Sequence, residues 1–255
     1  MERVKRYAFE GMTNIVRFNW PYYVFALVAI AGLFFSGNCF PEPFSFFAKL
    51  CGLGILVLTF VSLTVSWYIY DFSALYKFSW LDSLHPGPNQ VIVNMHAGFD
   101  ESSAILATRY PEAELLVFDF YDPLKHTEAS IERARKAYPV FPGTKRFETN
   151  HVPLKAGSVD RFFLILAAHE IRDDAERILF FGQLATGLKS GGRIIVVEHT
   201  RDLANFMGYT FGFLHFLSPV TWRKTFSGSG LTIDSSFKIT PFITIYILKK
   251  NGTPT

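Results

Sequence analysis

Two long runs without a charged side chain constrain this chain more than any other feature. Residues 18–41 and 50–70 contain no Asp, Glu, Lys or Arg and are rich in large apolar side chains. A helix needs roughly 20 apolar residues to cross the ~30 Å hydrocarbon core of a bilayer. Residues 37–43 (GNCFPEP) supply the turn chemistry of a short connection between the runs. The sequence therefore predicts an N-terminal transmembrane hairpin within residues 1–70, with spans at about 18–36 and 48–69.

The residues that flank these runs predict their orientation. Basic residues precede the first run, whereas only Lys49 adjoins the connection; the former are Arg3, Lys5, Arg6 and Arg17. Positively charged flanks stay in the cytoplasm, so both termini and the remaining domain are expected there, with the lipid bilayer as a partner. Aromatic residues gather at one end of both runs, as in an interfacial belt: Trp20, Tyr22, Tyr23, Trp67, Tyr68 and Tyr70.

Two alternatives to the hairpin are disfavoured. A cleaved signal peptide followed by a single anchor would need a shorter apolar core and a small-residue cleavage site. Lipoprotein processing at Cys39 is disfavoured by the preceding Asn38 and by the second apolar run. Both cysteines, Cys39 and Cys51, lie in the apolar region, so no disulfide framework is expected. The net charge of +3 is small and dispersed, which argues against a nucleic-acid partner; oligomerisation stays open.

After the apolar region, residues 71–255 alternate short β-branched runs with helical stretches. The expected strands are 91–93, 115–118, 161–167 and 193–198, and the expected helices are 101–109, 127–138 and 174–188. Residues 237–239 and 242–248 are expected to form an antiparallel hairpin at an edge. This alternation predicts an α/β domain with a mostly parallel, Rossmann-like sheet that is covered by helices on both faces.

In such sheets a ligand binds outside the carboxyl ends of the strands, so the residues that follow each strand are informative. Residues 94–100 (NMHAGFD) follow the first strand, and Asp119 follows the second. Asp119 comes about twenty residues after Gly98, which is the spacing at which a carboxylate accepts hydrogen bonds from a ribose. The sequence therefore predicts a nucleotide-containing cofactor at this edge.

Several short motifs, in order, resemble the class I S-adenosylmethionine-dependent methyltransferases over about residues 70–250. The most specific is residues 188–199 (LKSGGRIIVVEH); residues 152–154 (VPL), 158–160 (SVD) and 168–173 (AHEIRD) are the others. The resemblance implies a seven-stranded sheet, S-adenosylmethionine as cofactor and S-adenosylhomocysteine as product. It also implies that Glu148 holds the adenine amino group. The implied cofactor contacts are Tyr70, Tyr76, Asn94, His96, Gly98, Asp100, Asp119, Phe120, Glu148, Thr149 and Ala168.

The glycine-rich loop departs from the pattern of that family. The family shows an acid followed by glycines at alternate positions. Here Asn94 stands at the acidic position, and of the three glycine positions only Gly98 keeps its glycine, with His96 and Asp100 at the others. Glycine lets the backbone approach a cofactor closely, so His96 and Asp100 are expected to contact the methionine part through their side chains instead. A membrane-bound module that keeps the fold without catalysis is the alternative. A nicotinamide-dependent reductase is disfavoured because it normally keeps the tight glycine pattern.

A looser similarity to sterol and related lipid methyltransferases precedes the domain, at Tyr70, Asp71, Tyr76, Trp80, Ser83 and His85. In that family the segment packs over cofactor and substrate; an interfacial helix is an equally good interpretation, and both agree with a membrane enzyme.

Methyl transfer from a sulfonium requires alignment and, for some acceptors, a base. His169, Glu170 and His199 are the candidates because they follow the fourth and fifth strands. The sequence shows no cluster with metal-ligand spacing, so no metal is expected. It also has no Asn-Pro-Pro-Tyr-like motif, which disfavours nucleic-acid bases as acceptors.

The acceptor is expected to be hydrophobic and derived from the membrane: a lipid, a quinone, a sterol-like molecule or a polyene. Residues 205–217 are expected to form a helix that is apolar all round, and such a helix is either buried or touches a membrane or a greasy ligand. Its large side chains, with two that follow, are Phe206, Met207, Tyr209, Phe211, Phe213, Leu214, His215, Phe216, Trp222 and Phe226.

Overall fold

The structure is a computed structural model in which residues 6–84, 89–125 and 129–252 are described. The α-helices are α1 (Glu10–Phe18), α2 (Trp20–Cys39), α3 (Phe44–Trp67), α4 (Ser103–Arg109), α5 (Ala129–Ala137), α6 (Asp174–Gly187), α7 (Leu203–Tyr209) and α8 (Pro219–Gly228). The strands are β1 (Val91–His96), β2 (Glu114–Asp119), β3 (Lys145–Arg146), β4 (Val159–Ile165), β5 (Leu188–His199), β6 (Leu231–Thr240) and β7 (Ile243–Lys250). A π-helical turn at Tyr68–Phe72 follows α3 directly.

The strands form one seven-stranded sheet in the order β3-β2-β1-β4-β5-β7-β6. The pairs from β3 to β5 are parallel, and β7 is antiparallel to both β5 and β6. This confirms the expected mostly parallel sheet and its C-terminal antiparallel hairpin. Because the carboxyl ends of β1, β2, β4 and β5 lie at the same edge, the residues that follow these strands are brought together.

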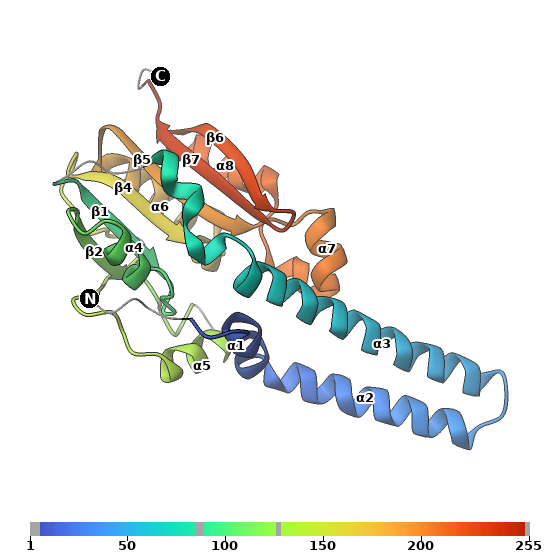
Figure 1. Cartoon of the computed structure of the whole chain (residues 1–255). Coiled ribbons are helices and arrows are strands. Elements are labelled where there is room, and N and C mark those ends of the chain that lie inside the picture. The colour runs from blue at the N-terminus through green and yellow to red at the C-terminus, as the bar shows by residue number, and fades with distance from the viewer. Residues whose placement is uncertain (1–5, 85–88, 126–128, 253–255) are drawn as a thin grey trace.

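The sheet is buried on both faces because its central strands are apolar at nearly every position. On β5, Ile194 and Val196 face one hydrophobic core, and Ile195 and Val197 face the other. The first core is completed by helices α6 and α8, and the second by α4 and residues 69–81. Figure 1 shows this layering of helices on the two faces of the sheet.

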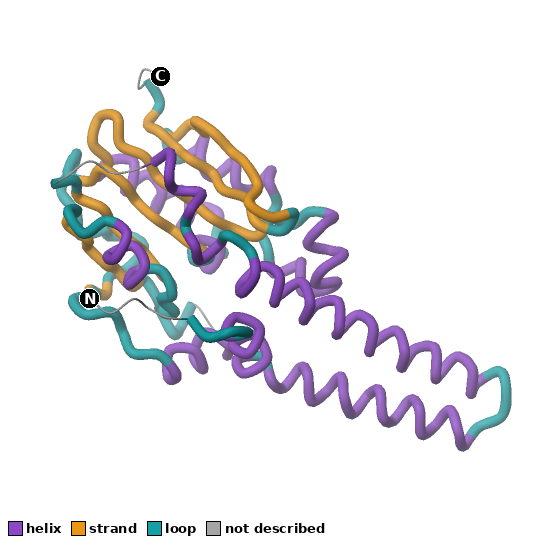
Figure 2. The backbone as a smooth tube through the Cα atoms, viewed as in Figure 1, coloured by secondary structure: helices purple, strands orange, loops and turns teal. Residues whose placement is uncertain are grey.

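Helices α2 and α3 form an antiparallel hairpin that projects from the α/β domain (Figures 1 and 2). By length and composition, both are apolar enough to cross a membrane, with mean hydropathies of 1.6 and 2.1. They lie where the two spans were expected, although α3 starts at Phe44 rather than near residue 48. Pro21 occupies the first turn of α2, where its missing N–H leaves no helical hydrogen bond unmade.

The expected helix at 205–217 is interrupted. Helix α7 ends at Tyr209, where Thr210 has φ 49°, and a 3₁₀ helix continues over Thr210–His215. Trp222 and Phe226 were expected to contribute to an apolar surface for a membrane or ligand. Instead, both are on α8 and are fully buried against Phe181 and Tyr246. Burial of such side chains contributes about 1.5–3 kcal/mol each, so they serve the core.

Candidate active site

Two cavities lie at the carboxyl edge of the sheet, on either side of Phe99. The larger, here called the His96 cavity, has a volume of about 640 Å³ and is bordered by the loop after β1, Tyr121 after β2, and α5. The smaller, here called the His169 cavity, has a volume of about 240 Å³ and lies between α1 and the segments that follow β4 and β5. Phe99 lines both. The larger cavity is in the usual size range of small-molecule sites, roughly 300–1,000 Å³.

The loop after β1 is held by its own side chains. Asn94 is fully buried and donates from Nδ2 to the hydroxyls of Ser102 and Ser103, both at 2.8 Å. The Asp100 Oδ1 accepts from the backbone N–H groups of Ser102 and Ser103 at 3.0 and 2.9 Å. Asp100 therefore stabilises the start of α4, whose N-cap residue is Ser102, and the helix starts at Ser103 rather than at residue 101. Asn94 supports the loop and does not line the His96 cavity.

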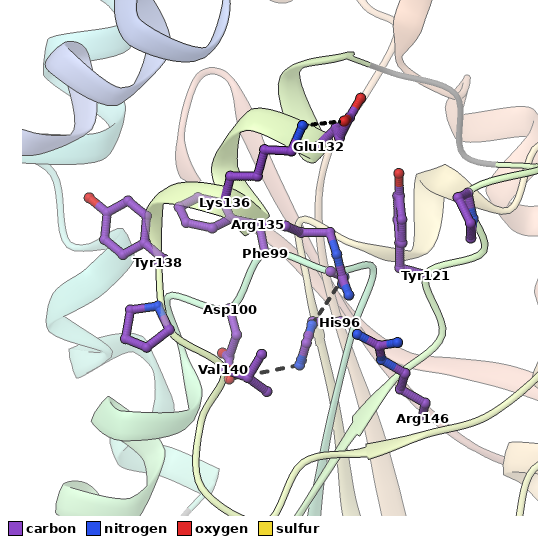
Figure 3. A pocket seen from close by; sticks show the side chains of 13 residues that line it. His96, Phe99, Asp100, Tyr121, Glu132, Arg135, Lys136, Tyr138, Val140 and Arg146 are labelled. Atoms are coloured by element: carbon purple, nitrogen blue, oxygen red, sulfur yellow. Dashed lines mark hydrogen bonds and ion pairs between the residues drawn. The ribbon is translucent and has the colours of Figure 1, made fainter.

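His96 and Asp100 both line the His96 cavity (Figure 3). The backbone N–H of Gly98 donates to His96 Nδ1 at 3.1 Å, which leaves the proton of the neutral ring on Nε2. Burial lowers the pKa of His96 despite the nearby Asp100 and Asp119 carboxylates. Within the described chain, His96 Nε2 and Asp100 Oδ2 have no hydrogen-bond partner, and they lie 3.9 Å apart. Buried polar atoms are normally satisfied by protein, water or ligand, so this donor and acceptor beside the cavity are candidates for contact with a ligand.

Asp119 lies at the end of β2, as predicted, and its side chain is 2% exposed. One oxygen accepts from the Tyr121 N–H at 2.9 Å, and the other is 2.6 Å from Arg135 Nη1 of α5. The Arg135 guanidinium also stacks on the Tyr121 ring at 4.5 Å. Gly98 has φ +93°, and a Cβ there would lie 2.5 Å from Arg135 Nη1. Arg135 thus occupies the space between the glycine loop and the carboxylate that was expected to bind a ribose.

The other residues that the resemblance implied are spread more widely. Phe120 is buried in the core against Phe147 and Phe180, so its ring faces away from the cavity. Thr149 is buried, and its carbonyl accepts from Gln183 at 2.9 Å. Glu148 is exposed, and Ala168 is buried beside His169; neither Phe120, Glu148, Thr149 nor Ala168 lines the two cavities.

His169, in a short 3₁₀ turn after β4 (Ala168–Glu170), is held between two carboxylates. Its Nδ1 lies 2.7 Å from Glu198 Oε2, and its Nε2 lies 3.1 Å from Glu170 Oε1. Burial alone would disfavour the imidazolium, but Glu198 and Glu170 outweigh it and raise the pKa of His169. Burial likewise opposes ionisation of Glu170, but His169 outweighs it and lowers the pKa of that carboxyl. The geometry brings together His169 and Glu170, both predicted, with Glu198, which was not.

A fourth side chain, His215, joins this group from a distant part of the chain. Its Nε2 lies 3.8 Å from Glu170 Oε1, and its ring meets that of His169 edge to face, with centroids 5.0 Å apart. The sequence named His215 only as part of the aromatic segment 205–217. Spacing alone gave no signal, because 45 residues separate it from Glu170.

Two features fix the segment that carries His169. Arg177 of α6 is fully buried and donates to the carbonyl oxygen of Ile171 at 2.7 Å. Leu166, between β4 and the turn, has φ 52°, a left-handed conformation that is uncommon for residues other than glycine. Such strain persists where the surrounding structure enforces it, often at functional sites.

His199, at the end of β5, lines the His169 cavity with Tyr70. Asn205 Nδ2 donates to the Phe242 carbonyl at 3.0 Å, which leaves its Oδ1 to accept from His199 Nδ1 at 3.1 Å. His199 Nε2 then accepts from the Tyr70 hydroxyl at 2.9 Å. Burial, together with the charge of His169, lowers the pKa of His199 to about 4. The ring is therefore neutral near pH 7.

Tyr70 and Tyr76, implied as cofactor contacts, line the His169 cavity rather than the His96 cavity. The Tyr76 hydroxyl donates to Glu101 Oε2 at 2.5 Å, and Arg6 Nη1 donates to Glu101 Oε1 at 2.7 Å. Burial raises the pKa of Glu101 even though Arg6 opposes it. Of the preceding similar stretch, His85 lies outside the described residues.

Helix α1 covers one side of the His169 cavity, which it lines with Gly11, Asn14, Ile15 and Phe18; this helix is the roof of the cavity. Its buried residues Gly11, Asn14 and Phe18 recur at helical spacing and form one face. The Asp71 carboxylate accepts from the backbone N–H groups of Gly11 and Met12 at 2.7 and 2.9 Å, which anchors the start of α1 to the π-helical turn. Helix α1 leads into α2 with one residue, Asn19, between them.

No protein-family model matches the chain, and no curated protein is similar to it in sequence. Many solved structures match its fold, including the following two. One is a methyltransferase from Haloferax volcanii in complex with a methyltransferase activator (TM-score 0.51, 12% identity, covering 72% of this chain and 90% of that one). The other is an S-adenosylmethionine-dependent methyltransferase from Methanosarcina mazei (TM-score 0.50, 13% identity, covering 66% of this chain and 95% of that one).

The chain has a Rossmann-like methyltransferase fold. Within this methyltransferase fold, the motifs that carried the sequence resemblance fall on the segment before β4, the start of β4, the turn after it and β5. Of their residues, His169, Glu170 and His199 line the His169 cavity. Three features of the site lie outside those motifs: Arg135 on Asp119, His215 beside Glu170, and the roof formed by α1.

Proposed function

We propose that this protein transfers a methyl group from S-adenosylmethionine to a hydrophobic acceptor that reaches the site from a membrane. The observation that carries the proposal is the pair of unpartnered buried atoms, His96 Nε2 and Asp100 Oδ2, on the wall of the larger cavity. The methionine part of the cofactor has an ammonium group to donate and a carboxylate to accept. A carboxylate oxygen and an imidazole N–H without partners have the complementary chemistry.

The proposed roles follow the two cavities. Asp119 takes the ribose after Arg135 has moved aside, and the sulfonium lies near Phe99, where the cavities adjoin. The acceptor occupies the His169 cavity, where the Glu170 carboxylate, paired with the positively charged His169 ring, accepts its proton. Tyr70 and His199 hold the acceptor in line. Bound S-adenosylmethionine would supply the methyl group: its bond to sulfur would break as the bond to the acceptor forms, which would leave S-adenosylhomocysteine as the product. The proposed adenine contact of Glu148 and cofactor contact of Thr149 would lie beyond the His96 cavity, since neither residue lines it.

Support for a membrane-derived acceptor comes from the surroundings of the smaller cavity. Its roof, α1, continues into α2, and Phe18 and Asn19 at that junction line the cavity. Helix α7 and the following turn lie beside α3 and expose large apolar side chains, among them Met207 (64%) and Phe211 (83%). A continuous apolar surface of this kind marks a membrane or partner contact. We propose that α2 and α3 span the bilayer and that the domain, with both termini, lies on its cytoplasmic side.

A non-catalytic membrane module with the same fold is the second candidate. The contact that favours it is the Arg135–Asp119 ion pair, which fills the expected ribose site. The two candidates differ in whether S-adenosylmethionine displaces Arg135.

The test is methyl transfer in membranes. The full chain is reconstituted in vesicles of membrane lipid extract and supplied with S-adenosylmethionine that carries a labelled methyl group. Label is expected in an organic-phase product, and it should be lost in Asp119→Asn and in His169→Gln. Asp234→Asn, on the opposite edge strand β6, is the matched control and should keep the activity. Cofactor binding without any labelled lipid would contradict the proposed acceptor, and no binding would contradict the enzyme.

A further inference from the structure

The arrangement of His169, Glu170 and His215 also suits a bound metal ion. One ligand atom from each residue lies within 4.8 Å of the other two. Ligand atoms that share a tetrahedral Zn²⁺ at ~2.0–2.1 Å are about 3.3 Å from one another. The distances from Glu170 Oε1 to His169 Nε2 (3.1 Å) and to His215 Nε2 (3.8 Å) bracket that value.

Glu198 provides the support that a metal-binding histidine normally has. It is fully buried, its Oε2 lies 2.7 Å from His169 Nδ1, and its Oε1 accepts from the His169 backbone N–H at 3.1 Å. This contact fixes the ring and directs Nε2 toward Glu170. Two buried carboxylates need a compensating positive charge. A metal ion would supply it by taking the place of the proton on His169 Nε2.

We propose that His169, Glu170 and His215 bind one divalent first-row transition-metal ion. Two imidazole nitrogens and one carboxylate suit Zn²⁺, Fe²⁺ or Co²⁺, whereas Mg²⁺ and Ca²⁺ prefer oxygen ligands. All three side chains line the His169 cavity, so the remaining coordination positions open into it. Arg172 must give way for binding, because its Nη2 lies 2.9 Å from His215 Nε2; its Nη1 is hydrogen-bonded to the His215 carbonyl oxygen.

A metal ion at this site would restrict the chemical groups that the acceptor can carry. This inference about the acceptor rests on the proposed function. An open position in a His₂Glu shell binds an oxygen ligand. The acceptor would therefore carry a hydroxyl or phenol group at its methylated end and an apolar remainder toward the α1–α2 junction. Metal binding itself does not depend on the cofactor.

The test measures the metal alone. The full chain in detergent is treated with chelator, desalted and titrated with Co²⁺, followed by its visible absorption and by calorimetry, and then competed with Zn²⁺. One equivalent is expected to bind with the absorption bands of imidazole-ligated Co²⁺. His215→Ala is the informative variant because His215 is partly exposed (27%) and its loss should leave the fold intact; it should lose the bands. His151→Ala, an exposed histidine elsewhere, is the matched control and should bind normally.

Glu198→Gln should keep the stoichiometry and weaken binding about 10–100-fold, because it supports a ligand without being one. No stoichiometric binding, or equal affinity in the wild type and His215→Ala, would overturn the proposal. Co²⁺ binding without S-adenosylmethionine binding would leave the metal site standing and contradict the proposed function alone.

Discussion

At the scale of single residues, the ion pair between Arg135 and Asp119 is the contact that most affects cofactor binding. Asp119 is nearly inaccessible to solvent, and Arg135 shields it further by stacking on Tyr121. Removal of the partner of a buried carboxylate is strongly destabilising, unless a ligand replaces that partner. A ribose with two hydroxyl groups has the donors to do so.

Arg135→Gln removes the competitor for Asp119. We expect S-adenosylmethionine to bind several-fold more tightly, because the cofactor no longer has to break an ion pair before its ribose reaches the carboxylate. Equilibrium titration of both proteins measures this. Lys224→Gln, on α8 and paired with Asp174 away from the His96 cavity, is the control and should leave the affinity unchanged. Weaker binding in Arg135→Gln would mean that Arg135 contacts the cofactor directly.

His199 gives the fold a dependence on pH. Its pKa is about 4 in the folded protein, against about 6.5 for a histidine in an unfolded chain. Between these values the unfolded state binds a proton that the folded state does not, so stability falls as pH decreases from about 6.5 toward about 4. The melting temperature in detergent should decrease less across this pH range in His199→Gln than in the wild type. His151→Gln should retain the wild-type slope, and an unchanged slope in His199→Gln would contradict the assignment.

At the scale of elements, α1 depends on a contact that is distant in sequence. The Asp71 carboxylate caps its first N–H groups, which also places a negative charge at the positive end of the helix. Asp71→Ala should destabilise α1 by about 1 kcal/mol, the usual cost of a lost cap. Amide exchange at Gly11 and Met12 should then become faster.

Asp173→Ala provides the comparison, because Asp173 caps α6 by accepting from the Glu176 N–H. That variant should speed exchange in α6 and leave α1 unaffected. Equal protection of α1 in Asp71→Ala and the wild type would show that packing against α5 and the π-helical turn suffices to hold it.

The elements were predictable where local pattern determines them. The apolar strands β1, β2, β4 and β5 were located, and their common edge placed Asp119, His169 and His199 near one another. Three contacts were beyond the sequence: Arg135 with Asp119, His215 with Glu170, and Asp71 with α1. Each joins segments whose approach depends on the path of a connecting loop, and periodicity holds no information on that path. The break at Thr210 was missed for a related reason, since apolar residues continue on both sides of it.

At the scale of the whole molecule, the hairpin and α7 together form the apolar surface that the proposed function requires. Met207 and Phe211 are exposed, so Met207→Glu with Phe211→Glu should fold normally. Because the charges would meet the bilayer, transfer to an acceptor in vesicles should fall several-fold. Transfer to the same acceptor in detergent should stay unchanged. Equal losses in both assays would indicate damage to the site instead of to membrane contact.

The central claim is that the larger cavity binds S-adenosylmethionine through Asp119, and calorimetric titration tests it most directly. The full chain in mild detergent is titrated with S-adenosylmethionine, S-adenosylhomocysteine and, for comparison, NADH. We predict one site that binds both sulfur compounds and not NADH, that is lost in Asp119→Asn and that is kept in Asp234→Asn. A folded protein that binds neither sulfur compound would contradict the account and favour the non-catalytic module.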